Sequence, residues 1–110
     1  MTLKAKTPNE LYRAIFEQAA EGIYFADIQG CFLEVNRQGC HLLGYTHEEL
    51  LNLAWTELFP PALHNLPIGQ TEFLKSQLRC KDGRLLPVEI KAHRLADTYL
   101  LAFVRDLIEP

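Results

Sequence analysis

The sequence predicts an α+β fold in which one five-stranded antiparallel sheet carries short helices on one face. Strand-like segments at 22–36 come first, a group of short helical segments at 36–58 follows, and three more strand-like segments lie between 71 and 106. Turn residues join neighbouring strand segments, which favours antiparallel pairing. The chain has 110 residues, of which 48% are hydrophobic, so we expect one domain with one core.

Charge and cysteine content exclude several classes of protein. The net charge is −3 and the charges are interspersed, so we expect neither nucleic-acid nor membrane contact. No apolar run reaches the roughly 18 residues of a membrane span, and the N-terminal residues lack the apolar segment of a secretory signal. Cys31, Cys40 and Cys80 show no paired spacing. We therefore expect free thiols in a reducing cytoplasm.

The first element is a predicted helix over residues 8–21. Thr7 is a suitable cap, Pro8 suits the first helical position, and Glu10 completes a capping box. Gly22 is the expected stop. Between this start and this stop, apolar residues recur at helical spacing, at Leu11, Ala14, Ile15 and Ala19.

A β-hairpin follows, with strands at 22–27 and 31–36 around a turn that contains Asp27 and Gly30. Asn36 is then the expected cap of a helix that ends at Gly44.

Two further short helices are predicted before a pair of prolines. Thr46 and Glu49 form a capping box that begins the first. One more turn is expected at 55–58. The proline-rich segment 60–70 then predicts a loop with at most one helical turn.

The last three strands are expected at 71–80, 85–95 and 98–106. Asp82-Gly83 is a strong hairpin signal between the first two. The last strand is almost continuously apolar, which predicts burial on both of its faces.

Three stretches, in this order and spacing, resemble a PAS domain. They are LYRAIFEQAAEGIYFAD at 11–27, LEVNRQGCHLLGYTHEELL at 33–51, and LRCKDGRLLPVEIKAHRL at 78–95 with FVRDLIEP at 103–110. The resemblance implies a sensory domain of a bacterial-type signalling protein. Such a domain senses a small ligand or cue and transmits it to an output domain through a dimer and a linker.

The resemblance also implies a domain organisation. Residues 1–21 would be a flanking helix, 22–106 the PAS domain, and 107–110 the start of a linker to an output domain. Arg105 and Asp106 would be the exit for the signal. The full-length protein would be a histidine kinase of a two-component system or a cyclic-dinucleotide enzyme, whereas the domain itself would not be an enzyme.

By the same resemblance, a ligand would bind in the cleft between the sheet and the short helices. Segment 60–70 is shorter than the helix that usually walls this cleft. The alternative is therefore a ligand-free dimerisation and relay module whose cleft is filled by its own side chains. The expected pocket residues come from strand alternation and family topology: Phe25, Leu43, Trp55, Leu58, Leu66, Ile90 and Phe103.

Cofactor sites receive little support, so we expect no cofactor. His64 lies where haem-binding relatives carry an axial histidine, but its segment is short and an exposed loop histidine is the expectation. The cysteine motif of light-sensing flavin relatives is missing, and residues 59–79 contain no cysteine for a thioester-linked chromophore. Trp55 and Phe59 could flank a flavin, although we expect them to pack in the core.

Cys40 and His41 are neighbours that do not form an obvious site. Adjacent helical residues point roughly 100° apart, and no further ligands lie at short spacing, so we expect no metal. Cys40 is expected to be buried beside Leu43 and His41 to be solvated. No G-x-S-x-G, P-loop or H-E-x-x-H motif occurs. A small α+β enzyme is therefore only the third hypothesis, after the ligand sensor and the relay module.

The N-terminal helix is apolar on more than one side, which predicts a second partner for it. Flanking helices of PAS domains commonly pack between two copies, so we expect a homodimer. The helix residues expected at its interface are Leu11, Tyr12, Ile15, Phe16 and Ala19.

Overall fold

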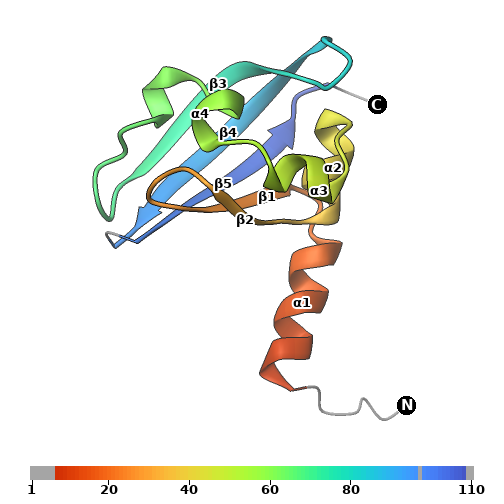
Figure 1. Cartoon of the computed structure of the whole chain (residues 1–110), viewed down its shortest axis with the longest axis vertical. Helices are drawn as coiled ribbons and strands as arrows, with labels where there is room; N and C mark the ends of the chain where they lie inside the picture. Colours follow the sequence, from red (N-terminus) through yellow and green to blue (C-terminus); the bar gives the residue numbers. More distant parts are fainter. Residues whose placement is uncertain (1–6, 97, 109–110) are drawn as a thin grey trace.

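A computed structural model, which describes residues 7–96 and 98–108, has the expected α+β architecture (Figure 1). The expected flanking segment 1–21 and linker 107–110 thus lie partly outside the described residues. All neighbouring strands are antiparallel, in the spatial order β2-β1-β5-β4-β3. The strands are β1 Gly22–Asp27, β2 Phe32–Val35, β3 Thr71–Arg79, β4 Leu85–Leu95 and β5 Tyr99–Asp106.

Short helices cover one face of this sheet, whereas α1 projects away from it (Figure 1). A single 3-10 turn, Pro61–Leu63, is the regular structure in the proline-rich segment, as expected. The α-helices are α1 Pro8–Gln18, α2 Arg37–Leu43, α3 His47–Leu51 and α4 Trp55–Leu58.

Most helix ends follow the caps that the sequence predicts. Thr7 Oγ1 accepts from the Glu10 amide at 3.1 Å, and Thr46 forms the expected capping box with Glu49. Gly44 adopts the left-handed conformation, with φ of 77°, that ends α2.

The expected end of the first helix near residue 21 is wrong, because α1 ends at Gln18. Ala19 is already extended, with φ −62° and ψ 141°. Gly22 instead begins β1, where α2 packs closely: a Cβ atom on Gly22 would lie 3.0 Å from the Gly39 Cα. Gly22 therefore serves helix–strand packing and does not cap the helix.

Burial alternates along the central strands, so the sheet has one covered face and one open face. Tyr24 and Ala26 of β1 and Ala102 of β5 are fully buried under the helices. Leu101 of β5 points to the other face and is half-buried. The expectation that β5 is buried on both faces is wrong, because no described element covers the outer face.

Two expected pocket residues, Phe25 and Phe103, lie on that outer face. Phe25 stacks on Tyr99 with ring centroids 4.9 Å apart, and the Lys91 ammonium lies 4.9 Å from the Phe103 ring centroid. Their placement in the interior cleft is therefore wrong. Both strands have apolar residues on both faces, so alternation alone does not tell which set faces the helices.

Asn36 is the one fully buried polar residue in the described part of the chain. Its Oδ1 accepts from the amides of Ile23 (2.9 Å) and Gly39 (2.8 Å). Its Nδ2 donates to the carbonyls of Phe16 (2.9 Å) and Glu21 (3.0 Å). One side chain thus joins α1, β1 and α2, and its hydrogen-bonding capacity is fully used.

We predict that Asn36→Ala lowers the free energy of unfolding by about 3 kcal/mol or more, because it leaves buried backbone groups without partners. Asn52→Ala is the matched control. Asn52 is exposed and its side chain donates only to the Glu48 carbonyl, so we expect its replacement to cost less than about 1 kcal/mol. Urea unfolding of both variants checks this, and equal losses would contradict it.

Candidate functional site

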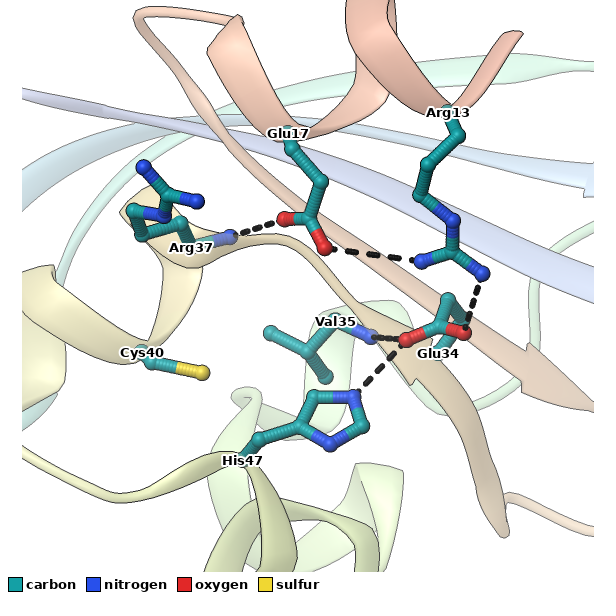
Figure 2. Close-up of a pocket in the computed structure, with 7 residues that line it drawn as sticks. All are labelled: Arg13, Glu17, Glu34, Val35, Arg37, Cys40 and His47. Carbon is teal, nitrogen blue, oxygen red and sulfur yellow. Dashed lines mark hydrogen bonds and ion pairs between the residues drawn. The ribbon is translucent and has the colours of Figure 1, made fainter. Parts of the chain in front are cut away.

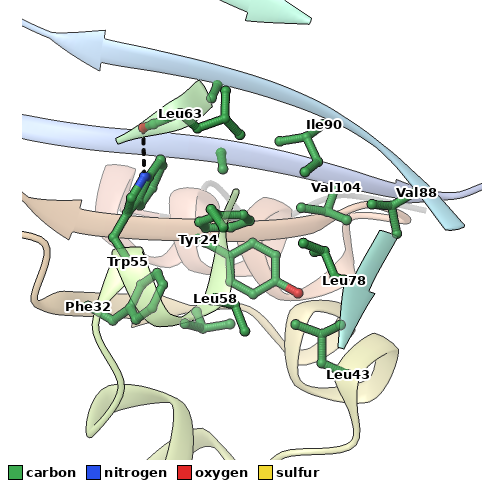
Figure 3. Packing of buried hydrophobic residues seen from close by; sticks show 14 of the residues in the cluster. Tyr24, Phe32, Leu43, Trp55, Leu58, Leu63, Leu78, Val88, Ile90 and Val104 are labelled. Carbon is green, nitrogen blue, oxygen red and sulfur yellow. Dashed lines mark hydrogen bonds between the residues drawn. The ribbon is translucent and has the colours of Figure 1, made fainter. Parts of the chain in front are cut away.

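The cleft expected between the sheet and the short helices is occupied by the protein's own side chains (Figure 3). Trp55 is 1% exposed and its Nε1 donates to the Leu63 carbonyl at 3.0 Å. The structure brings five of the expected pocket residues together here as core: Leu43, Trp55, Leu58, Leu66 and Ile90.

Aromatic contacts close the place where a flavin ring would be expected. The Trp55 and Phe59 ring centroids are 4.6 Å apart, which is direct contact. Tyr24 meets Phe59 edge-on at 5.5 Å. Trp55 and Phe59 therefore pack on one another, as the sequence analysis expected for core aromatics.

Tyr24 carries a buried polar group in this interior. Its hydroxyl donates to the Gly39 carbonyl at 2.8 Å. Burial, with smaller effects from Cys40 and Cys80, raises the pKa of Tyr24 far above its ordinary value. Tyr24 is therefore a neutral donor that fixes α2 on β1.

A solvent-open cavity of about 490 Å³ lies where α1 meets the rest of the domain. We call it the junction pocket (Figure 2). It is lined by Arg13, Glu17, Glu34, Val35, Arg37, Cys40 and His47.

Charged side chains connect α1 across this pocket. Glu34 Oε2 lies 3.6 Å from Arg13 Nη2, and Glu34 Oε1 lies 2.8 Å from His47 Nε2. Glu17 accepts from the Arg37 amide at 2.8 Å. Exposed pairs of this kind contribute little stability individually.

From the sequence, no role was assigned to His47. The position is exposed, but the imidazole contacts Glu34. Only the Arg13–Glu17 pair, four residues apart on α1, was visible as a sequence signal.

Cys40 lines the junction pocket and is half-buried, whereas Leu43 lies in the core. Cys40 is thus less buried than expected, although it packs against the core that contains Leu43. Burial raises the pKa of the Cys40 thiol, and the charges of Glu17 and Glu34 raise it further. A raised thiol pKa disfavours the nucleophilic thiolate.

His41 is exposed, as expected. No group of three or more His, Cys, Asp or Glu residues within 7–96 and 98–108 could hold a metal ion.

His64 is half-buried, so the expectation of an exposed loop histidine is wrong. Its Nε2 lies 2.7 Å from the Phe59 carbonyl oxygen. A carbonyl only accepts, so Nε2 carries a proton there. That hydrogen bond would have to break before Nε2 could bind haem iron.

The expected exit residues end β5 in defined positions. Arg105 Nη2 lies 2.8 Å from Glu89 Oε1, and this hydrogen bond and charge lower the pKa of Glu89. Asp106 Oδ1 accepts from the Ile108 amide at 2.7 Å. A carboxylate that accepts from the amide two residues later is typical of a helix start.

The expected interface residues of the first helix divide into two groups. Leu11, Tyr12 and Ile15 are 51%, 61% and 63% exposed. We call these three the α1 stripe. Phe16 is only 3% exposed and packs against its own domain, so its placement at an interface is wrong. Ala19 lies beyond the end of α1 and is half-buried.

The comparisons with known proteins agree on one family. A family model described as "PAS domain" matches residues 10–78. A domain of the sensory box sensor histidine kinase/response regulator from Geobacter sulfurreducens is 32% identical, with a TM-score of 0.75. The match covers 89% of this chain and 93% of that one.

More distant matches agree on the fold. The PAS domain of an HTR-like protein from Haloarcula marismortui is 24% identical, with a TM-score of 0.79, and the match covers 90% of this chain and 91% of that one. The methyl sulfide methyltransferase-associated sensor of Methanosarcina acetivorans is 24% identical over 96 residues, or 79% of this chain. The matched region makes up 10% of that sensor's length.

None of the helices formed by the described residues is long and apolar enough to cross a membrane.

The buried hydroxyl of Tyr24 predicts a pH-dependent contribution to stability. Near neutral pH, Tyr24→Phe should lower the free energy of unfolding by about 1 kcal/mol through loss of the hydrogen bond to Gly39. Above about pH 10, the ordinary tyrosine pKa, the unfolded chain ionises while the folded chain stays protonated. The contribution of Tyr24 is therefore present below that pH and lost as pH rises further.

Urea unfolding of the parent protein and Tyr24→Phe over a series of pH values measures this effect. The difference between the two proteins should shrink above about pH 10. A difference that stays constant into the alkaline range would contradict the assignment.

Proposed function

This chain belongs to the PAS domain family, the sensory and non-catalytic modules of signalling proteins, and on that premise we propose that it is a dimerisation and relay module. The observation that carries the proposal is the α1 stripe, which leaves three large apolar side chains exposed. The filled interior supports a relay role over a buried cofactor site.

The α1 stripe fits a second copy of the same helix. Fully burying a side chain of this size contributes about 1.5–3 kcal/mol, so three per protomer provide a substantial driving force. α1 projects away from the sheet (Figure 1), so the domain itself does not cover the stripe. A symmetric pair of α1 helices would bury the same residues on both copies.

Movement of α1 would be transmitted to the domain through one buried contact and through polar contacts around it. Phe16 is buried and its carbonyl accepts from Asn36. Around it, Glu17 holds the start of α2, while Arg13 reaches Glu34 of β2. A change at the dimer helix would thus reach two elements of the core.

We propose that the signal leaves through Arg105 and Asp106, where the Asp106 carboxylate would cap the first turn of a following helix. In this proposal residues 1–21 flank the PAS domain at 22–106, and 107–110 begin the linker. The output domain would be a histidine kinase or a cyclic-dinucleotide enzyme. The described cysteines are free, which supports a reducing, cytoplasmic setting.

A small ligand is the second candidate cue. It is favoured by a cavity of about 260 Å³ beside His64, outside the filled interior. Any such ligand acts only if it binds two states of the domain unequally.

We predict that Ile15→Glu shifts the protein from dimer to monomer, because a charge at the most exposed residue of the α1 stripe would have to be desolvated. Sedimentation velocity over a concentration series measures the shift. The matched control is Asn9→Glu, which adds the same charge at an exposed position on another side of α1.

The control should dimerise like the parent protein. A parent chain that stays monomeric at the highest concentrations, or an equal loss of dimer in both variants, would contradict the role of the α1 stripe.

A further inference from the structure

We propose that a cleft at the end of the sheet binds the carboxylate of a small organic anion, with Arg94 as its principal ligand. We call it the arginine cleft. It has a volume of about 260 Å³, and it is lined by Ile28, His64, Asn65, Leu66, Arg94 and Leu100. This inference goes beyond the proposed relay function, which needs no ligand.

The guanidinium of Arg94 has few partners. Arg94 pairs with Leu100 in the sheet, on the helix-facing side. Its Nη1 donates to the Leu66 carbonyl at a long 3.5 Å. Its Nε is buried without a hydrogen-bond partner, and no carboxylate among the described residues pairs with it.

An unpaired donor of a charged group is costly when water cannot reach it, by about 1–3 kcal/mol or more. The Nε and Nη2 atoms of arginine form one edge with two parallel N–H groups, which matches the two oxygens of a carboxylate. Because Nη1 is directed to Leu66, this edge is the part of the group left to bind. A carboxylate would satisfy both donors once the guanidinium turns from its buried position toward the cleft.

The remaining walls fit the rest of a small organic anion. Ile28, Leu66 and Leu100 are apolar and suit a short carbon skeleton. His64 uses Nε2 as donor to the Phe59 carbonyl, so Nδ1 of the neutral ring is left to accept a hydrogen bond, for example from a hydroxyl group of the ligand. The volume lies below the roughly 300–1,000 Å³ of sites for drug-sized ligands, which points to a small carboxylate.

A ligand in the arginine cleft would act on the segment 66–69, which contacts Arg94. The Arg94 carbonyl accepts from the Gly69 amide at 3.1 Å, and Ile68 forms an isolated β-bridge with Arg94. A ligand that draws the guanidinium away from the Leu66 carbonyl would alter the hold on Leu66, which is a core residue. The cleft is thus coupled to the interior through one side chain.

Isothermal titration calorimetry of the whole chain with succinate, citrate and inorganic phosphate tests the proposal. We expect binding of at least one carboxylate, and a loss of about tenfold or more in affinity in Arg94→Gln and Arg94→Lys, since lysine lacks the paired donors. Arg79→Gln is the matched control. It removes the same charge from an exposed position at the far end of β3, and affinity should be unchanged.

Side-chain ¹H–¹⁵N spectra of the parent protein give a second readout that needs no variant. The Arg94 Nε–H signal should shift on addition of the carboxylate that binds. No heat and no shift with any carboxylate would overturn the proposal, as would equal affinities for the parent and Arg94→Gln. Binding of phosphate alone would overturn the carboxylate assignment.

Sedimentation of the same samples separates this inference from the relay proposal. Dimers without carboxylate binding would overturn only the arginine cleft. Carboxylate binding by a monomeric chain would overturn only the dimer relay.

Discussion

The four hydrogen bonds of Asn36 are the constraint on which the rest of the structure depends. They hold the end of α1, the start of β1 and the first turn of α2 at one buried point. Close packing around that point requires small residues: a Cβ on Gly39 would lie 2.7 Å from Val35 Cγ1. The same approach places the Gly39 carbonyl within reach of the Tyr24 hydroxyl. The orientation of α1 and the closure of the core therefore have one origin.

Features set by neighbours in sequence were predictable, whereas those set by contacts across the fold were not. The caps at Thr46 and Gly44 follow from local backbone chemistry, and the structure confirms them. The end of α1 depends on Asn36, 20 residues away from the carbonyl that it binds, and was misjudged. The faces of Phe25 and Phe103 were misjudged for another reason. Their strands are apolar on both sides, and only the helices decide which side becomes the interior.

Because side chains fill the interior, a ligand would have to bind in a cavity at the edge of the domain. Aromatic rings in direct contact occupy the centre, so a ligand there would have to displace buried side chains at a large cost. The junction pocket and the arginine cleft are both open to solvent, so a ligand there would not have to displace the buried aromatic rings. They differ in charge balance. Acidic and basic groups in the junction pocket already pair with each other, whereas Arg94 in the arginine cleft keeps an unpaired donor.

Strand order would give the proposed relay a short path. β1 follows α1 in sequence, and β1 pairs with β5, whose end is the proposed exit. Gly22, the first residue of β1, pairs with Val104, two residues before Asp106. The residue that begins β1 therefore pairs within two residues of the end of β5 on one antiparallel ladder. A rotation of α1 within a dimer would act on the exit through this pairing, without repacking the core between them.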